Sequence, residues 1–416
     1  MQSSDTDLLV VGGGPGGSTL AALVARAGFK VKVLDRVPFP RFHVGESLLP
    51  IDLPLFERLG VDVQGPGFLF KGGADFYDEA RGLHSSFSFA NGLPGTQDHA
   101  YQVRRQDFDH QLLQIAERDG AQLEMGERVR TFSEVQGGLE VVTESGRSFK
   151  TRYLVDATGQ DAWLARQNRT LETIKDFGRA AVFGHHGELD EKLWGELTEN
   201  GHIRILMVPD GWSWTIPLPN RQVSIGLVSR LPGLTPQALI DFIAASPMLS
   251  RLTGSGRRLN EPTMFRNFSY RNTRPRGARW CCIGDAGLFL DPVFSTGVSL
   301  AMLGAERLAD LLVDALPRGS EGGAEFAKPI SDHMYRAYLS FASLIWSFYN
   351  TNLVDNFFFA QDPRPDIRAG IVTLLSGDAW RTDNPFQEML LNSERRRFDP
   401  TVPNDPATAA AALAGD

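Results

Sequence analysis

The alternation of apolar and polar positions is clearest at the start of the chain. Residues 8–11 form an apolar run, residues 18–28 have the apolar spacing of a helix with one buried face, and residues 30–36 form a second strand-like run. This order predicts a strand, a helix and a second, parallel strand.

The turn between the first strand and the helix is rich in glycine and contains the pattern GxGxxG at residues 12–17. Gly12 allows the turn, Gly14 lets a pyrophosphate approach the backbone, and Gly17 lets helix and strand pack closely, while the helix N-terminus faces the phosphates. Asp35 ends the second strand, where it can accept hydrogen bonds from a ribose. The glycine pattern alone could come from a helix hairpin, but with strand, helix, strand and acid in order it predicts a dinucleotide site.

Further along, the pattern favours strands over helices until the last third of the chain. Two glycine-bearing turns follow strand-like runs at residues 154–159 and 284–287, and the second leads into a long helix. The expected elements are a helix at 107–118, a strand at 121–126, hairpins at 133–159, strands within 173–228, a helix at 297–316, an aromatic-rich helical segment at 340–360 and a frayed end.

Composition narrows the class of protein. A chain of 416 residues predicts two or three structural units, and its 42 glycines, about 10% against a usual 7%, indicate tight turns or close approaches of backbone to a ligand. The net charge of -8 and a pI near 5.6 argue against a nucleic-acid partner. Neither a membrane-spanning run nor a secretory signal is evident, so we expect a cytoplasmic protein. Adjacent Cys281 and Cys282 predict buried thiols and no metal site.

Taken separately, the later glycine turns are ordinary junctions. Together and in this order, from Asp7 to about Trp380, the blocks resemble flavoprotein monooxygenases and flavin-dependent halogenases. The resemblance implies an α/β fold, in which a Rossmann-like FAD-binding domain of the GR2, hydroxybenzoate-hydroxylase-like type carries an inserted β-sheet substrate domain and a C-terminal helical segment. The implied boundaries are 1–60, 95–172 and 270–320 for the FAD domain, 61–94 and 173–269 for the substrate domain, 325–400 for the helical region and 401–416 for a disordered tail.

The same resemblance assigns residues to the cofactor FAD. The glycines of the first turn and Asp35 would hold its ADP half, and Arg105 would contact the flavin. Asp285 would hold the ribityl or pyrophosphate region, and the segment containing Glu46 and Ser47 would lie over the flavin. The cofactor residues implied are Gly12, Gly14, Gly17, Asp35, Glu46, Ser47, Arg105, Asp285 and Gly297.

Three further pieces resemble halogenases in particular. Residues 212–217 match the signature WxWxIP at Trp212, Trp214, Ile216 and Pro217, which would line a tunnel. Lys71 occupies the place of the family's catalytic lysine, and Thr296 and Gly297 match the segment whose amides hold chloride or bromide. The implied chemistry is the formation of hypohalous acid from reduced FAD, oxygen and halide, and its delivery past two indoles to Lys71, either as a hydrogen-bond donor or as a haloamine.

The resemblance leaves the substrate and two other classes of function open. Phe294 stands where tryptophan-specific halogenases carry a glutamate, so the chain looks closer to phenol and pyrrole halogenases, including those that act on acyl or peptidyl carrier proteins. We find no second complete GxGxxG unit, so a separate flavin reductase is the expected source of reduced FAD. The alternatives are a flavin-dependent hydroxylase or prenyl reductase without halide chemistry, and a non-catalytic flavoprotein.

One cluster of charge bears on the partner. Eight arginines lie between Arg251 and Arg279, with Glu261 the only acid among them. In an acidic chain this cluster could steer an acidic carrier protein. Alternatively, the arginines are scattered over a solvated face or pair internally.

Overall fold

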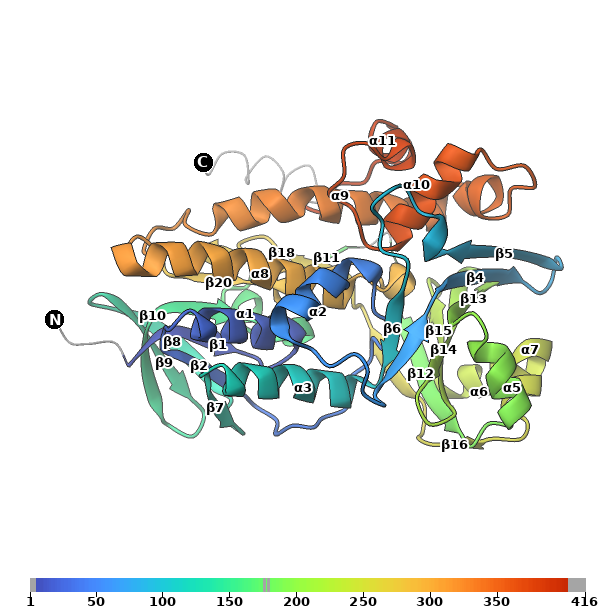
Figure 1. Cartoon of the computed structure of the whole chain (residues 1–416). Helices are drawn as coiled ribbons and strands as arrows, with labels where there is room; N and C mark the ends of the chain where they lie inside the picture. Colours follow the sequence, from blue (N-terminus) through green and yellow to red (C-terminus); the bar gives the residue numbers. More distant parts are fainter. Residues whose placement is uncertain (1–4, 175–176, 178–179, 403–416) are drawn as a thin grey trace.

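The computed structural model describes residues 5–174, 177 and 180–402. The expected frayed end therefore lies outside the described residues from position 403 onwards. Two large sheets dominate the arrangement (Figure 1). The strands of the first sheet come from the start and the middle of the chain, and the strands of the second sheet lie between these segments in the sequence. Three C-terminal helices lie alongside.

The first sheet carries the predicted βαβ unit. Its central strands β10, β1 and β2 are parallel, and β1 is buried along nearly its whole length, as is usual for a parallel sheet covered on both faces. The strands in spatial order are β19 (Arg276–Gly277), β20 (Trp280–Cys282), β10 (Ser148–Asp156), β1 (Thr6–Val11), β2 (Val31–Asp35) and β7 (Gln122–Met125), with β8 (Val129–Val135) and β9 (Gly138–Thr143) paired beyond β10.

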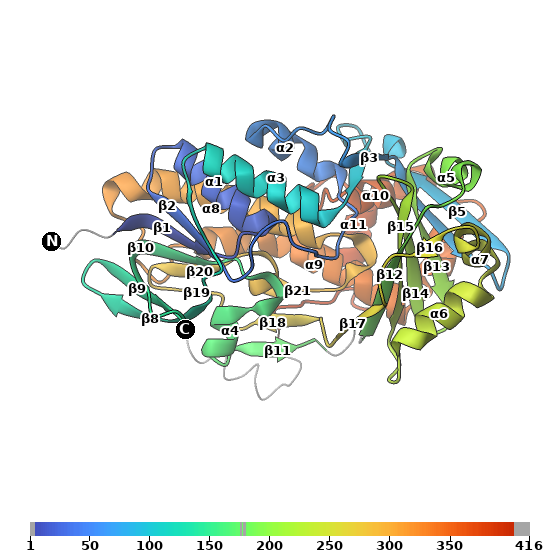
Figure 2. The ribbon, with the colours of Figure 1, turned by 90° about the horizontal axis from the view of Figure 1, so that it is seen from below.

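Side chains of the first sheet alternate between two cores. Leu8 and Val10 of β1 pack under the helices α1 (Pro15–Arg26), α3 (Arg105–Arg118) and α8 (Gly297–Ala315), while Leu9 and Val11 pack against the β8–β9–β10 hairpins. Figure 2 shows the helices and the hairpins on opposite faces of the sheet. The predicted helices at 107–118 and 297–316 are thus confirmed, the first beginning two residues earlier, at Arg105.

The second sheet is mostly antiparallel. Its strands are, in spatial order, β16 (Arg257–Arg258), β12 (Ala180–Gly187), β15 (Gln222–Ser229), β14 (Gly211–Leu218), β13 (His202–Val208), β4 (Gly73–Asp78) and β5 (Leu83–Ser88), with β17 (Thr263–Arg266) paired to β12. The short helices α5 (Glu191–Thr198), α6 (Pro236–Ala245) and α7 (Pro247–Thr253) cover one face. Every residue of β14 is buried, because the opposite face packs into the aromatic core.

Smaller elements join the two sheets. The strand pair β3 (Phe68–Lys71) and β6 (Ala100–Val103) and the three-stranded sheet β11 (Leu171–Thr173), β18 (Tyr270–Asn272) and β21 (Leu288–Phe289) lie between them. The remaining helices are α2 (Leu53–Leu59), α4 (Trp163–Gln167), α9 (Lys328–Asn350), α10 (Pro365–Leu375) and α11 (Pro385–Leu391). The aromatic-rich segment is helical as predicted, but it ends in a π-helical turn at Val354–Phe358.

Candidate active site

A cavity of about 1160 Å³ lies between the two sheets. Its wall joins segments that are far apart in the sequence: the glycine turn, residues 41–47, the turn after β10, the start of α8 and one face of β13 and β14. Of the residues predicted for the site, those that line it are Gly12, Gly14, Asp35, Glu46, Ser47, Arg105, Trp212, Trp214, Ile216, Asp285, Thr296 and Gly297. The structure therefore brings most of the predicted set around one space.

The glycine turn forms a cradle with no room for side chains. Gly12 has a φ of +107°, and a Cβ placed there would lie 2.3 Å from the carbonyl oxygen of Ala157. A Cβ at Gly17 would lie 1.9 Å from the oxygen of Gly12, so helix and turn are in direct backbone contact. Gly17 itself supports the cradle from behind and does not line the cavity.

Asp35 has a second role that the sequence pattern does not reveal. Its two carboxylate oxygens accept hydrogen bonds from the amides of Gly13, at 2.8 Å, and Val37, at 2.9 Å. The carboxylate thereby fixes the glycine turn, and each oxygen keeps a further lone pair for a ribose hydroxyl.

Arg105 is held at the base of the cavity by the first turn of α3. Its guanidinium binds Asp109, one helical turn on, through Nε at 2.7 Å and Nη2 at 3.0 Å, and Nη1 donates to the carbonyl of Val44 at 2.7 Å. Arg105 thus positions the 41–47 segment as well as lining the cavity. Burial, followed by the charge of Arg105, lowers the pKa of His43 to about 4, so His43 is neutral.

Glu46 and Ser47 present unsatisfied polar atoms at the cavity wall. Glu46 Oε1 lies 2.8 Å from Nε2 of His185 on β12, but Glu46 Oε2 and Ser47 Oγ are buried and have no hydrogen-bond partner among the residues that the structure describes. Buried polar atoms are rarely left unpaired unless a ligand or water serves them. These atoms and the glycine cradle fit a large polar cofactor with a pyrophosphate and a planar ring.

The opposite wall is formed by Asp285 and the start of α8. Burial raises the pKa of Asp285 to about 7, against the opposing effect of the Arg105 charge. Thr296 is the N-cap of α8, and Ser295 before it has a φ of +57°. The first amides of a helix have no intrahelical acceptor, so those near Thr296 and Gly297 suit an anion.

The two tryptophans lie on the same face of β14, as their alternation predicts. Their ring centroids are 5.6 Å apart, and the indole of Trp214 donates to Ser224 Oγ at 3.2 Å. Ile216 continues this face, whereas Pro217 points away and does not line the cavity. The predicted tunnel face is therefore Trp212, Trp214 and Ile216 without Pro217.

Lys71 lies just outside this cavity, at the end of β3. Its side chain is only 1% exposed, its Nζ donates to the carbonyl of Leu48 at 2.7 Å, and it lies 5.3 Å from the ring centroid of Phe89. Burial lowers the pKa of this amine to about 7, although the charge of Asp52 acts in the opposite direction.

Sequence reasoning missed a hydrogen-bond chain beside the tryptophans. Trp212 Nε1 donates to the hydroxyl of Tyr349 at 2.8 Å, and this hydroxyl donates to Asp291 Oδ2 at 3.0 Å. Asp291 Oδ1 accepts from the amide of Val293 in the turn that leads to Thr296. The chain joins β14, α9 and the start of α8, and no local sequence signal links residues so far apart.

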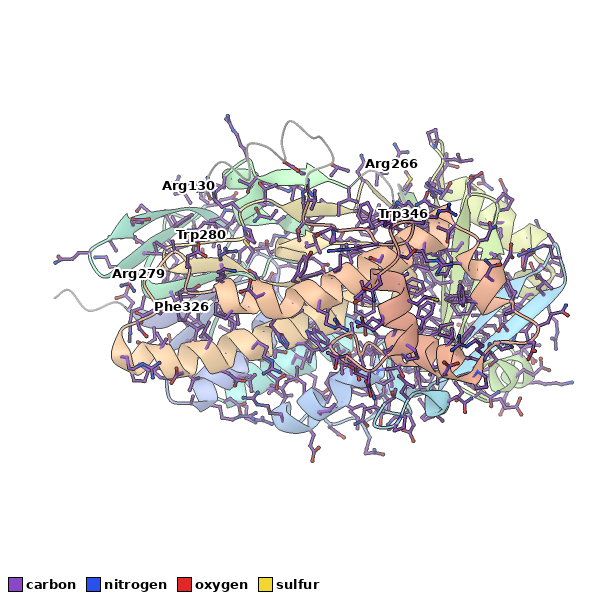
Figure 3. The ribbon with its side chains drawn as sticks, turned by 90° about the horizontal axis from the view of Figure 1, so that it is seen from above. Arg130, Arg266, Arg279, Trp280, Phe326 and Trp346 are labelled. Atoms are coloured by element: carbon purple, nitrogen blue, oxygen red, sulfur yellow. The ribbon has the colours of Figure 1, made fainter. Side chains whose placement is uncertain are left out.

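The arginine cluster at 251–279 does not form a single surface. Arg266 and Arg279 lie far apart along the molecule (Figure 3), and most of the set forms ion pairs. These pairs are Arg251 with Glu196, Arg257 with Glu188, Arg258 with Glu261, Arg271 with Glu172, Arg276 with Glu325 and Arg279 with Glu321. The internal-pairing interpretation is the one that the geometry supports.

Residues 5–174, 177 and 180–402 contain neither a membrane-spanning helix nor a metal-binding cluster. No helix there is both long and apolar enough to cross a bilayer. No cluster of three or more histidine, cysteine or acidic side chains that could hold a metal ion was found in the same part of the chain. Cys281 and Cys282 are free thiols on β20.

Comparisons with known proteins agree with the site. A family model described as tryptophan halogenase matches residues 7–99 and 92–368. The chain is 33% identical to flavin-dependent halogenase armH4 of Armillaria mellea over 72% of this chain and 63% of that protein, so it spans less than two thirds of that relative. It is 28% identical to 1H-pyrrole-2-carbonyl-(peptidyl-carrier protein) brominase of Pseudoalteromonas luteoviolacea, over 94% of this chain and 98% of the relative.

A solved structure is similar along nearly the whole chain. The flavin-dependent brominase Bmp2 superposes with a TM-score of 0.81 at 25% identity, over 93% of this chain and 97% of that one. These similarities favour halogenase chemistry over the hydroxylase and reductase alternatives, and FAD over other dinucleotides as the cofactor of the cavity.

Proposed function

The chain belongs to the tryptophan halogenase family of FAD-dependent halogenases, and on that premise we propose that it halogenates an activated aromatic ring, a phenol or a pyrrole. Reduced FAD, oxygen and chloride or bromide are the co-substrates. The observation that carries the proposal is the single cavity, in which the glycine cradle, the indole face of β14 and the start of α8 meet.

Each wall of the cavity receives a part of the cofactor. Gly12, Gly14 and Asp35 hold the ADP half, and Asp285 holds the ribityl or pyrophosphate region. Glu46, Ser47 and Arg105 would hold the flavin end, where the cofactor would offer a polar partner to the oxygens of Glu46 and Ser47 that have none among the described residues. When bound, FAD supplies the redox chemistry by which halide and oxygen become hypohalous acid.

The protein's own residues control where the halogen goes. The amides of Thr296 and Gly297 hold the halide beside the flavin. Trp212, Trp214 and Ile216 exclude water and organic molecules from that end of the cavity, because they form a continuous apolar face. Lys71 receives the hypohalous acid outside this cavity and presents the halogen to the ring, either by donating a hydrogen bond to the acid or as a haloamine formed with release of water. Its pKa of about 7 makes both protonation states accessible near neutral pH.

The substrate class follows from what surrounds Phe294. This side chain is 4% exposed and packs edge to face on Phe348, so position 294 supplies no carboxylate to remove a proton from the ring. A phenol or pyrrole needs less help, since its heteroatom stabilises the cation. The relative named for a peptidyl-carrier-protein substrate supports a tethered ring as one form of the substrate. A separate flavin reductase and a cytoplasmic setting complete the proposal.

The test is a product assay with purified protein, FAD, NADH, a flavin reductase, oxygen and bromide or chloride. Phenols and pyrroles, free and attached to a carrier protein, are offered, and products are analysed by mass spectrometry for the halogen isotope pattern. Halogenated product that requires halide supports the proposal. Hydroxylated product without any halogenated product contradicts the proposal and supports the hydroxylase alternative.

A further inference from the structure

Lys71 and Asp52 are two buried ionisable residues whose side chains form hydrogen bonds with the same peptide group. Lys71 is 1% exposed and Asp52 is fully buried. Lys71 Nζ donates to the carbonyl of Leu48 at 2.7 Å, and the amide of Leu49 donates to Asp52 Oδ2 at 3.3 Å. This carbonyl and this amide belong to the same peptide bond, so its dipole points its negative end at the amine and its positive end at the carboxylate.

Asp52 is also tied to the helix that bounds the cavity. Ser299 Oγ, in the first turn of α8, donates to Asp52 Oδ2 at 2.8 Å. Thr296 and Leu300, on either side of Ser299, line the cavity. A chain of hydrogen bonds therefore runs from the start of α8 through Asp52 and one peptide group to the amine of Lys71.

The carboxylate is incompletely satisfied, which is unusual for a buried acid. Asp52 Oδ1 has no hydrogen-bond partner among the described residues. Such a group is costly to bury unless a nearby charge compensates it. The charge of Lys71 lowers the pKa of Asp52, and the charge of Asp52 raises the pKa of Lys71.

We propose that Asp52, held by Ser299 and the Leu49 amide, is a positioning residue that favours the protonated form of the Lys71 amine and directs this amine at the Leu48 carbonyl. The proposal rests on the function proposed above for Lys71. It gives Lys71 a counter-charge from the segment before α2.

The pKa values of the two groups agree with this geometry. Burial lowers the pKa of Lys71 to about 7 while the Asp52 charge raises it, and burial raises the pKa of Asp52 to about 7 while Ser299, the Leu49 amide and Lys71 lower it. Removing the carboxylate therefore leaves only burial acting on Lys71, and the pKa of Lys71 falls further.

The test compares Asp52→Asn with the intact protein in a measurement that does not depend on halogenation. The chain is labelled with ¹³Cε-lysine, the Lys71 signal is assigned by its loss in Lys71→Arg, and its pH titration is followed by NMR. Asp52→Asn keeps the shape of the side chain and loses its charge. We expect its Lys71 midpoint to move to lower pH by about one unit, with a smaller move in the same direction for Ser299→Ala.

Glu321→Gln is the matched control, because Glu321 is 2% exposed and ion-paired but belongs to the distant cluster with Arg152 and Arg279. It should leave the Lys71 titration unchanged. An unchanged midpoint in Asp52→Asn overturns the proposal, as does an equal shift in Glu321→Gln. Where Asp52→Asn does not fold, an unchanged midpoint in Ser299→Ala overturns it instead.

Failure of the proposed function gives a different result. If Lys71→Arg halogenates like the intact chain, the role of Lys71 is wrong, yet the midpoint shift in Asp52→Asn still reports the coupling. If Lys71 is essential, the part of the pH–rate profile that reports the titration of Lys71 (the Lys71 limb) should move to lower pH in Asp52→Asn, with the affinity for FAD unchanged. A merely structural role for Asp52 would lower the rate without moving that limb.

Discussion

Gly226 makes room for one of the two indoles, and replacing it by alanine should move that indole. Gly226 on β15 lies directly opposite Trp214 on β14. An added Cβ would lie 2.1 Å from Cζ2 and 2.3 Å from Cη2 of the indole, where about 3.4 Å is ordinary contact. Trp214 packs on Trp212 and Phe183 and also lines the cavity, so its ring can escape the added Cβ only by breaking these ring contacts or by moving into the cavity.

The cost of Gly226→Ala follows from these contacts. Forcing extra volume into a packed core costs about 1–3 kcal/mol. Losing the 3.2 Å hydrogen bond from Trp214 Nε1 to Ser224 costs a further ~1 kcal/mol. We therefore expect the free energy of unfolding to fall by about 2–4 kcal/mol. The displaced indole should also open the apolar face. The yield of halogenated product per reduced flavin oxidised should then fall.

Urea unfolding measures the first effect, as a lower midpoint with an unchanged m-value, and product per reduced flavin oxidised measures the second. The control is Gly195→Ala, at a helical position with no neighbouring atom within 4 Å; it should raise stability by roughly 0.5–1 kcal/mol. If Gly226→Ala has the stability of the wild type and forms as much halogenated product per reduced flavin oxidised, the assignment of Trp214 to the cavity wall is refuted.

Substitutions at the glycine turn, at the Tyr349–Asp291 hydrogen bond and at Asp285 should each have a distinct effect. Gly17→Ala places a Cβ 1.9 Å from the backbone oxygen of Gly12, so FAD affinity measured by flavin fluorescence should fall at least about tenfold, and unchanged affinity would contradict the cradle. Tyr349→Phe removes the donor to Asp291, so the halide concentration for half-maximal rate should rise while FAD affinity stays the same. Because burial raises the pKa of Asp285 to about 7, its contribution to stability is lost as pH rises from about 4 to 7; FAD-free Asp285→Asn should melt higher than the intact chain at pH 8 and equally at pH 4, and the opposite trend would count against this environment.

The fold could be predicted where the signal was local. The βαβ unit, the alternation of Trp212 and Trp214 and the helix beginning at Gly297 all follow from periodicity and glycine placement over short stretches. The common cavity could be anticipated only through resemblance to a family, because its walls come from segments more than 200 residues apart.

Other features depend on tertiary packing, which the sequence pattern does not report. The unpartnered Asp52 Oδ1 and the Trp212–Tyr349–Asp291 chain arise where separate elements meet. Pro217 was expected in the tunnel because it belongs to the motif, but the two-residue period of the strand turns it away. Asp35 was expected to face a ribose, and it also braces the turn because the amide of Gly13 lies within reach.

If halogen generated at the cavity reaches substrate only through Lys71, the amine of Lys71 is essential for halogenation of the ring but not for oxidation of reduced flavin. The most direct measurement is the yield of halogenated ring in Lys71→Met, together with free hypohalous acid caught by a trapping thiol and the rate of reduced-flavin oxidation. Methionine is unbranched and nearly as long as lysine, and it lacks the amine. We expect near-normal flavin oxidation, trapped hypohalous acid and no halogenated ring. Halogenated ring at the wild-type yield would contradict it.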